Sequence, residues 1–300
     1  MIVVTGATGN TGKPAVEALL ANGEKVRVIG RDAFKLEPFV KHGAEPLVGS
    51  VEDPSLLQRA FQGATAAYIL IPPDMNTSEF RAYQDRLVDL YAAAIAETKI
   101  PYVVTLSSIG ADQPQKTGPI LGLRNLETKL NAIPGLNVLH LRPAGFMENL
   151  FMSVQPLRSM GVLPGPLPGD APHAMIACRD IGTYAAEKLR GRDFHGSSVQ
   201  ELLGQRDVTM KEVASIVGSA IGKPKLGYMQ VPFMMLEPAL VQTGIQKPTA
   251  ALMIEMWKSM NSGAIKPLEP RNAKNTTPTS IETFVAEVFA PAYMAMSAKA

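Results

Sequence analysis

Val3-Val4-Thr5-Gly6-Ala7-Thr8-Gly9-Asn10-Thr11-Gly12 is the stretch that decides the fold of this chain. A short apolar run, residues 1–4, leads directly into three glycines with the spacing Gly-x-x-Gly-x-x-Gly, and a helix-like apolar pattern follows over residues 14–20. A strand, a tight glycine turn and a helix in this order aim backbone N–H groups and a helix N-terminus at a diphosphate. The stretch therefore predicts a dinucleotide-binding site, and a glycine-rich turn without a ligand is the alternative.

The three glycines have separate roles in such a turn. Gly6 lets the chain turn sharply, Gly9 lets the backbone approach the ligand, and Gly12 lets the helix pack closely on the strand. Polar residues stand between them. The cofactor-binding candidates in this stretch are Gly6, Thr8, Gly9, Asn10, Thr11 and Gly12.

Length and composition describe an ordinary globular protein. The 300 residues are 46% hydrophobic and 19% charged, with a formal net charge of +2, so we expect no nucleic-acid partner. Cys178 is the single cysteine, which excludes an internal disulfide, and the four histidines are scattered, so no metal site is expected. No apolar run is long enough to span a membrane, and no secretory signal pattern is found, so we expect a cytoplasmic protein.

Strand-like and helix-like patterns alternate through the first half of the chain. Continuous apolar strands separated by helices predict an α/β fold, with a doubly wound, mostly parallel Rossmann sheet covered on both faces. We expect residues 1–150 to form this dinucleotide-binding domain and residues 151–300 to form a smaller α+β substrate lobe, with an approximate boundary and interleaved lobes. After the first strand, the predicted strands are 26–29, 46–48, 66–71, 102–106 and 138–141, and the predicted helices are 56–61, 79–97 and 125–132.

Four polar residues predict where later helices begin. Asp180 is expected to be an N-cap, because it directly precedes an apolar helical pattern. Asn76, Thr209 and Thr279 each stand three residues before a glutamate, which is the spacing of a capping box.

The end of the second strand bears on the choice of cofactor. An NAD site usually has an acidic residue there to hold the ribose 2′-hydroxyl, whereas this chain has Gly30 followed by Arg31. A guanidinium favours a 2′-phosphate, and Lys35 supplies a second cation, so we predict NADP(H) in preference to NAD(H). Asp32 opposes this prediction, and Arg31 as a simply solvated residue at a strand end is the alternative.

Residues after the next three strands are further candidates, because ligands of such sheets bind beyond the carboxyl ends of the strands. Ser50 and Val51 are expected beside the adenine, and Ile71 and Pro72 beneath the nicotinamide ribose. The hydroxyl groups of Ser107 and Ser108 are expected to form hydrogen bonds with the nicotinamide carboxamide or with a substrate carbonyl. Turn formation is the alternative role for the loop that holds Ser50 and Val51 and for the two serines.

The chain resembles the NmrA-like group of atypical short-chain dehydrogenase/reductases. The resemblance rests on residues 5–12, on Arg31, on Leu141-Arg142-Pro143-Ala144-Gly145-Phe146-Met147-Glu148-Asn149-Leu150 and on residues 179–182, and it extends to about residue 245. It implies that the backbone of Pro143, Ala144, Gly145 and Phe146 lies beside the nicotinamide. The group includes NADPH-dependent reductases of quinones, ethers and imines, and also NADP-sensing regulators that catalyse nothing.

One feature departs from the wider superfamily, in which a Tyr-x-x-x-Lys pair lies on the helix after the fifth strand. No tyrosine occurs between Tyr102 and Tyr184, so the usual proton donor is missing. Arg124 and Asn125 lie on this helix as weak catalytic candidates, because neither side chain is a good general acid.

The remaining candidates form an expected substrate pocket. Phe146 and Phe151 follow the sixth strand and are expected to form its apolar wall, and His173 is a candidate for substrate contact or proton transfer. We therefore expect an NADPH-dependent reductase that transfers hydride to a quinone, an imine or a conjugated acceptor, and that binds a small planar substrate. A non-catalytic NADP(H) sensor that acts through a protein partner is the alternative.

Overall fold

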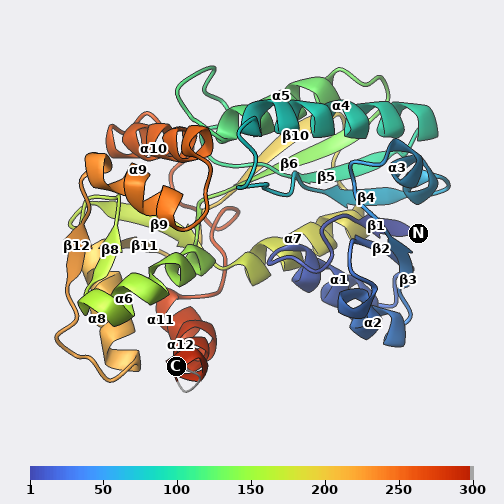
Figure 1. Ribbon diagram of the computed structural model, residues 1–300. Coiled ribbons are helices and arrows are strands. Elements are labelled where there is room, and N and C mark those ends of the chain that lie inside the picture. The colour runs from blue at the N-terminus through green and yellow to red at the C-terminus, as the bar shows by residue number, and fades with distance from the viewer. Residues whose placement is uncertain (298–300) are drawn as a thin grey trace.

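The computed structural model describes residues 1–297, and its first strand, β1 (Ile2–Val4), lies inside a seven-stranded sheet (Figure 1). The strand order is β10-β6-β5-β4-β1-β2-β3, and every neighbouring pair is parallel. The predicted doubly wound Rossmann sheet is therefore confirmed. The other strands of this sheet are β2 (Val26–Gly30), β3 (Glu45–Val48), β4 (Ala66–Ile69), β5 (Tyr102–Leu106), β6 (Asn137–Pro143) and β10 (Ser197–Leu202).

Helices cover both faces of this sheet, which explains why its central strands are continuously apolar. One buried cluster joins the sheet to helices α1, α2 and α7, and a second joins the opposite face to α3, α4 and α5. The bounds are α1 (Gly12–Ala21), α2 (Ala33–Lys41), α7 (Cys178–Gly191), α3 (Pro54–Phe61), α4 (Phe80–Thr98) and α5 (Ile120–Asn131).

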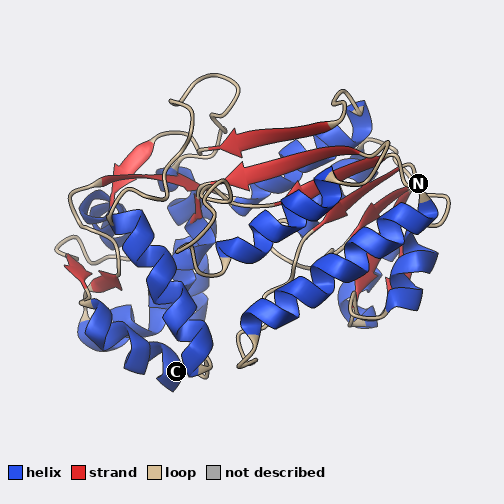
Figure 2. Cartoon of the chain, turned by 90° about the horizontal axis from the view of Figure 1, so that it is seen from above, coloured by secondary structure: helices blue, strands red, loops and turns tan. Residues whose placement is uncertain are grey.

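The smaller lobe lies to one side of the large sheet (Figures 1 and 2). It contains a three-stranded sheet of order β11-β9-β7 and a two-stranded pair, β12-β8, surrounded by helices. The strands are β7 (Gly145–Phe146), β8 (Leu163–Gly165), β9 (Pro172–Ile176), β11 (Asp207–Thr209) and β12 (Tyr228–Gln230). The helices are η1 (Met147–Ser153, 3₁₀), α6 (Val154–Met160), α8 (Met210–Ala220), α9 (Phe233–Gln242), α10 (Lys247–Asn261), α11 (Ile281–Phe284), η2 (Val285–Phe289, π) and α12 (Ala290–Ser297).

The large sheet takes parts from both halves of the chain. Strand β10 pairs with β6 as the edge strand, and α7 packs along α1. The α7–α1 contact is close at Gly182, where an added Cβ atom would overlap the carbonyl oxygen of Thr11. Helix α7, from the second half of the chain, therefore packs against the residues of the glycine turn. A division into lobes near residue 150 stays a prediction.

The helix starts follow the predicted signals only in part. Thr209 caps α8 as predicted, because its Oγ1 accepts the backbone N–H of Glu212 over 3.1 Å. The prediction for Asp180 is wrong: α7 begins at Cys178, and the carboxylate of Asp180 instead accepts the backbone N–H and the hydroxyl of Thr279.

Two further capping boxes were placed wrongly. The cap of α11 is Ser280 rather than Thr279, because Thr279 is occupied by Asp180. Helix α4 begins after Glu79, whose side chain makes no capping hydrogen bond, so Asn76 does not form the expected box. Within residues 1–297, none of the helices has both the length and the apolar character needed to cross a membrane.

Candidate cofactor site

The glycine turn presents unused backbone donors at the N-terminus of α1. Gly6 has a φ of 60°, which only glycine adopts readily, and the N–H of Gly9 bonds back to the Gly6 carbonyl over 2.9 Å. The backbone N–H groups of Thr8, Asn10 and Thr11 have no acceptor among the described residues. Three free donors beside a helix N-terminus form a site for an anion such as a diphosphate.

The turn is held rigidly from the interior. The Thr11 hydroxyl accepts a hydrogen bond from the hydroxyl of Tyr68 over 3.1 Å, and both side chains are buried. The hydroxyl of Thr5 donates to the carbonyl of Tyr68 and accepts the N–H of Leu70, each over 3.2 Å. An added Cβ atom on Gly12 would overlap the carbonyl oxygen of Gly6. These contacts hold in place the backbone that carries the free donors.

Two free cations follow β2. The side chains of Arg31 and Lys35 are exposed and make no ion pair or hydrogen bond with any residue that the structure describes. Asp32 lies between them, but its Oδ1 accepts the N–H of Phe34 over 2.9 Å and so caps α2. The carboxylate at this position is thus used to start a helix.

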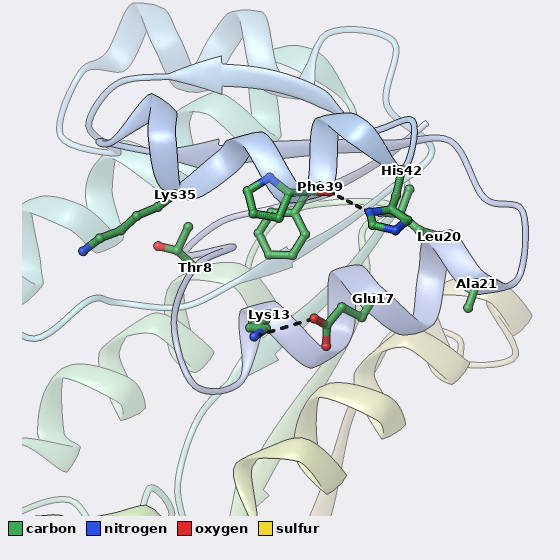
Figure 3. A pocket seen from close by; sticks show the side chains of 9 residues that line it. Thr8, Lys13, Glu17, Leu20, Ala21, Lys35, Phe39 and His42 are labelled. Atoms are coloured by element: carbon green, nitrogen blue, oxygen red, sulfur yellow. Dashed lines mark hydrogen bonds and ion pairs between the residues drawn. The ribbon is translucent and has the colours of Figure 1, made fainter. Parts of the chain in front are cut away.

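A cavity of about 570 Å³ lies between α1 and α2 and is lined by Lys35. Figure 3 shows Lys35 and the hydroxyl of Thr8 together at one end of this cavity, and Lys13, paired with Glu17 over 3.8 Å, along one wall. Lys35 and Thr8 of the glycine turn both line this cavity, Arg31 does not, and the 2′-phosphate site remains a prediction.

The loops after β3 and β4 have simpler local explanations. The Ser50 hydroxyl accepts the N–H of Glu52 over 3.2 Å, which forms a turn, while Val51 is buried. Ile71 is buried, and the carbonyl of Pro72 accepts the hydroxyl of Tyr83 over 3.0 Å. All four residues follow the carboxyl ends of their strands, and their contact with a cofactor remains a prediction.

Ser107 belongs to a buried polar network that sequence reasoning missed. Its hydroxyl donates to Glu127 Oε1 over 2.5 Å, and the guanidinium of Arg142 donates to both oxygens of Glu127 over 2.9 and 2.6 Å. Burial alone would raise the pKa of Glu127, but the hydrogen bonds from Arg142 and Ser107 hold it below its usual value. The network joins the end of β5, helix α5 and strand β6, and it keeps Glu127 ionised.

The other weak catalytic candidates are occupied by structural hydrogen bonds. Arg124 donates to the carbonyls of Ala111 and Asp112 over 3.2 and 2.7 Å, and Asn125 donates to Asp85 over 2.7 Å. Ser108 donates to the carbonyl of Ile109 over 2.9 Å. These bonds brace the loop after β5 and the contact of α5 with α4, and a catalytic role for the three residues remains a prediction.

The segment after β6 forms the crossing into the smaller lobe. The N–H of Ala144 bonds to the carbonyl of Leu202 over 2.9 Å, and Phe146 is half-buried against the core of the large sheet. Both oxygens of Glu148 accept the N–H of Cys178, over 3.0 and 3.1 Å. Pro143 and Gly145 complete this backbone segment at the carboxyl edge, and Glu148 secures it to the start of α7.

The two remaining pocket candidates lie in the smaller lobe, where both are half-buried. Phe151 packs against Phe289, with ring centroids 5.3 Å apart, and is part of the lobe's own apolar core. His173 lies on β9 with Nε2 3.4 Å from the carbonyl oxygen of Pro168, and burial lowers its pKa. Among residues 1–297, no group of three acidic, histidine or cysteine side chains is arranged to hold a metal ion.

Comparison with known proteins agrees with this geometry. The NmrA-like family model matches residues 1–285. An NAD(P)H azoreductase of Xenophilus azovorans is 26% identical over 264 residues, 86% of each chain, and a (4-alkanoyl-5-oxo-2,5-dihydrofuran-3-yl)methyl phosphate reductase of Streptomyces griseus is 28% identical over 224 residues, 75% of each chain.

A solved structure shares the fold along nearly the whole chain. The NADPH complex of an NADPH-dependent quinone oxidoreductase from Escherichia coli superimposes with a TM-score of 0.78 and 20% identity, covering 96% of this chain and all of that one. The glycine turn, the sheet order and the family match together give one conclusion. This chain belongs to the NmrA-like family.

Proposed function

We propose that this chain is an NADPH-dependent reductase that transfers hydride to a quinone, an imine or a conjugated acceptor. The observation that carries the proposal is the set of three unpaired N–H groups in a rigid glycine turn at the N-terminus of α1. Such a turn fits the diphosphate of a pyridine nucleotide, which supplies the hydride when it is bound. The two relatives named above, an azoreductase and a furanone phosphate reductase, are both named as reductases, which supports this proposal.

The preference for NADP(H) rests on charge. Arg31 and Lys35 are exposed and unpaired within the described residues, and Lys35 shares a cavity with Thr8 of the glycine turn. Charge-assisted hydrogen bonds from these cations fit a 2′-phosphate better than a 2′-hydroxyl. Asp32 does not compete strongly for the ribose, because its carboxylate caps α2.

The reaction depends on positioning more than on acid catalysis. Helix α5 carries Glu127, kept ionised by Arg142, and no tyrosine, so it offers no ready proton donor. Hydride transfer to an electrophilic acceptor needs little help of that kind, since water can deliver the proton afterwards. The acceptor must instead be held near the hydride in a fixed orientation.

Calorimetric titration with NADPH and NADH tests the cofactor part of the proposal. We expect the wild-type protein to bind NADPH more tightly, and Arg31→Ala and Lys35→Ala each to weaken NADPH binding about tenfold while leaving NADH binding unchanged. Lys41→Ala is the matched control, because this exposed lysine of α2 pairs with Glu37 and does not line the cavity. Equal losses for both nucleotides would remove the basis for the preference.

Oxidation of NADPH with a panel of quinones, iminium salts and enones tests the catalytic part. Turnover of any acceptor class supports a reductase. Tight NADPH binding without turnover of any acceptor would instead favour a non-catalytic sensor that acts through a protein partner.

A further inference from the structure

A second cavity lies at the end of the large sheet that faces the smaller lobe. It has a volume of about 450 Å³, within the range of small-molecule sites, and lies between β9 and the segment 266–271. Three prolines form rigid apolar walls, at positions 172, 267 and 270, and Leu203, directly after β10, closes the side next to the sheet. The cavity thus lies beyond the carboxyl end of a sheet strand, where ligands of this fold bind.

The cavity opens on the same face of the small sheet as Phe146. Successive residues of a strand point to opposite faces, so Pro172, Ala174 and Ile176 of β9 share one face. Ile176 pairs with Phe146 across β9 and β7, and Pro172 and Ala174 line the cavity. The cavity and Phe146, in the segment after β6 that is the candidate nicotinamide end of the site, therefore lie on the same face of the small sheet.

The wall formed by residues 266–271 is tied firmly to the sheet. Both carboxylate oxygens of Glu201, a buried residue of β10, accept the N–H of Leu268 over 2.9 and 3.0 Å, and Oε2 also accepts the N–H of Glu269 over 3.1 Å. Arg271 donates to the carbonyl of Leu203 over 3.0 Å and forms an ion pair with Asp207. A wall held in this way can orient a ligand.

Lys266 is the unpaired cation of this cavity. Its ammonium makes no ion pair or hydrogen bond with any of the described residues, whereas Arg271 and Asp207 neutralise each other. Ile265, directly before it, is buried against Gly110 in the loop that follows β5. Lys266 therefore directly follows a residue that packs against the loop after β5. Glu269 also lines the cavity, and its backbone N–H is bound by Glu201.

We propose that this cavity receives the acceptor of the reductase, and that Lys266 makes carbonyl acceptors, such as quinones and enones, the substrates in preference to iminium ions. This inference rests on the proposed function. Hydride addition to a conjugated carbon forms a C–H bond and moves the π electron pair onto the carbonyl oxygen, which becomes an oxyanion. The ammonium of Lys266 stabilises that charge, solvent then supplies the proton, and the nucleotide is oxidised by two electrons.

An iminium ion has the opposite electrostatics. It is a cation before hydride addition and a neutral amine afterwards, so a neighbouring ammonium repels the substrate and does not stabilise the product. Removal of the Lys266 charge should then change the two acceptor classes in opposite directions, which a merely structural role of the residue would not do.

The experiment measures kcat/KM for a neutral quinone and for a preformed iminium salt, with NADPH saturating. Lys266→Ala should lower kcat/KM for the quinone about tenfold, because the variant loses the attraction between a partly solvated ammonium and the developing oxyanion. The kcat/KM for the iminium salt should stay equal or rise. Lys266→Arg should retain most of the quinone activity. Lys274→Ala is the matched control, since this lysine lies on the same segment of chain but outside the cavity lining.

NADPH affinity, measured by calorimetry, should be the same in all variants. Equal changes for both acceptors, or no change for the quinone in Lys266→Ala, would overturn the inference while leaving the reductase proposal intact. Absence of turnover by the wild-type protein with every acceptor would instead contradict the proposed function, and this inference with it.

Discussion

Gly12 faces the carbonyl oxygen of Gly6 so closely that a Cβ atom on Gly12 would overlap it. The first turn of α1 is therefore held against the residue that reverses the chain after β1. This contact keeps the free N–H groups of the turn pointing at one place, and it makes the glycine turn a single rigid unit.

Gly12→Ala should weaken NADPH binding and lower the stability of the protein. The added methyl group must push α1 away from the turn, which we expect to destabilise the protein by about 1–3 kcal/mol and to weaken NADPH binding at least tenfold. Thermal unfolding and calorimetric titration measure the two effects. Gly227→Ala is the control, because no atom lies within 4 Å of a Cβ atom at that position. Normal NADPH affinity in a folded Gly12→Ala protein would contradict the assignment of the turn.

Two variants of Asp32 distinguish its role as the cap of α2 from the effect of its negative charge on cofactor binding. Asp32→Asn keeps an oxygen that can accept the Phe34 N–H and cap α2, but it removes a negative charge between Arg31 and Lys35. We expect NADPH to bind a few-fold more tightly, with NADH unaffected. Asp32→Ala should instead lose the cap and about 1 kcal/mol of stability. Weaker NADPH binding in Asp32→Asn would show that the carboxylate contacts the ribose.

His140 should make the protein lose stability in weak acid. Its ring lies 2.8 Å from the Thr105 hydroxyl and 2.9 Å from Asn131 Oδ1, and burial lowers its pKa to about 4. Between pH 6.5 and 4 the unfolded chain binds a proton at His140 that the folded protein does not, so the free energy of unfolding falls as the pH falls. We expect a loss of about 2 kcal/mol between pH 7 and pH 5.

Chemical denaturation at pH 5, 6, 7 and 8 measures this dependence. His140→Gln should flatten it, whereas His195→Gln, which changes an exposed histidine, should not. Glu127 does not contribute in this range, because the pKa of Glu127 lies below its usual value. An unchanged slope in His140→Gln would assign the acid sensitivity to other groups.

Asp180 should be needed to attach the last helices. Its buried carboxylate accepts the N–H of Thr279 over 2.9 Å and the Thr279 hydroxyl over 2.6 Å. Asp180→Ala leaves a buried donor without a partner, so we expect a loss of about 1–3 kcal/mol. Asp170→Asn is the control, since Asp170 forms an exposed pair with Lys211. Protease sensitivity confined to residues after 278 would locate the effect, and a stable Asp180→Ala protein would refute it.

Local signals in the sequence were enough for the large sheet and the glycine turn. Apolar strands separated by helices, and glycines at fixed spacing, act over a few residues and can be identified without knowing the rest of the chain. The capping box at Thr209 belongs to the same class. The preference for a polar residue at a helix start is also local. Asp180 does not follow it, because its carboxylate binds Thr279, which is 99 residues away in the sequence.

The missed features depend on contacts between distant segments. Glu127 and Arg142 look like ordinary charged residues in the sequence, and only the packing of α5 on β6 brings them together with Ser107. The cavity beside Lys266 likewise needs β9, β10 and a late segment to meet. Periodic patterns in the sequence do not predict such contacts, because the contacts depend on how distant segments pack in the folded chain.

The close approach of Gly182 to Thr11 has a consequence for synthesis on the ribosome. A nascent chain that ends near residue 150 lacks α7 and β10, so α1 has one side uncovered and β6 is an open sheet edge. Unpaired edges of this kind attract other chains. The nucleotide-binding half should therefore reach its final packing only after about fifty more residues have emerged, and a fragment truncated at residue 150 should aggregate instead of binding cofactor.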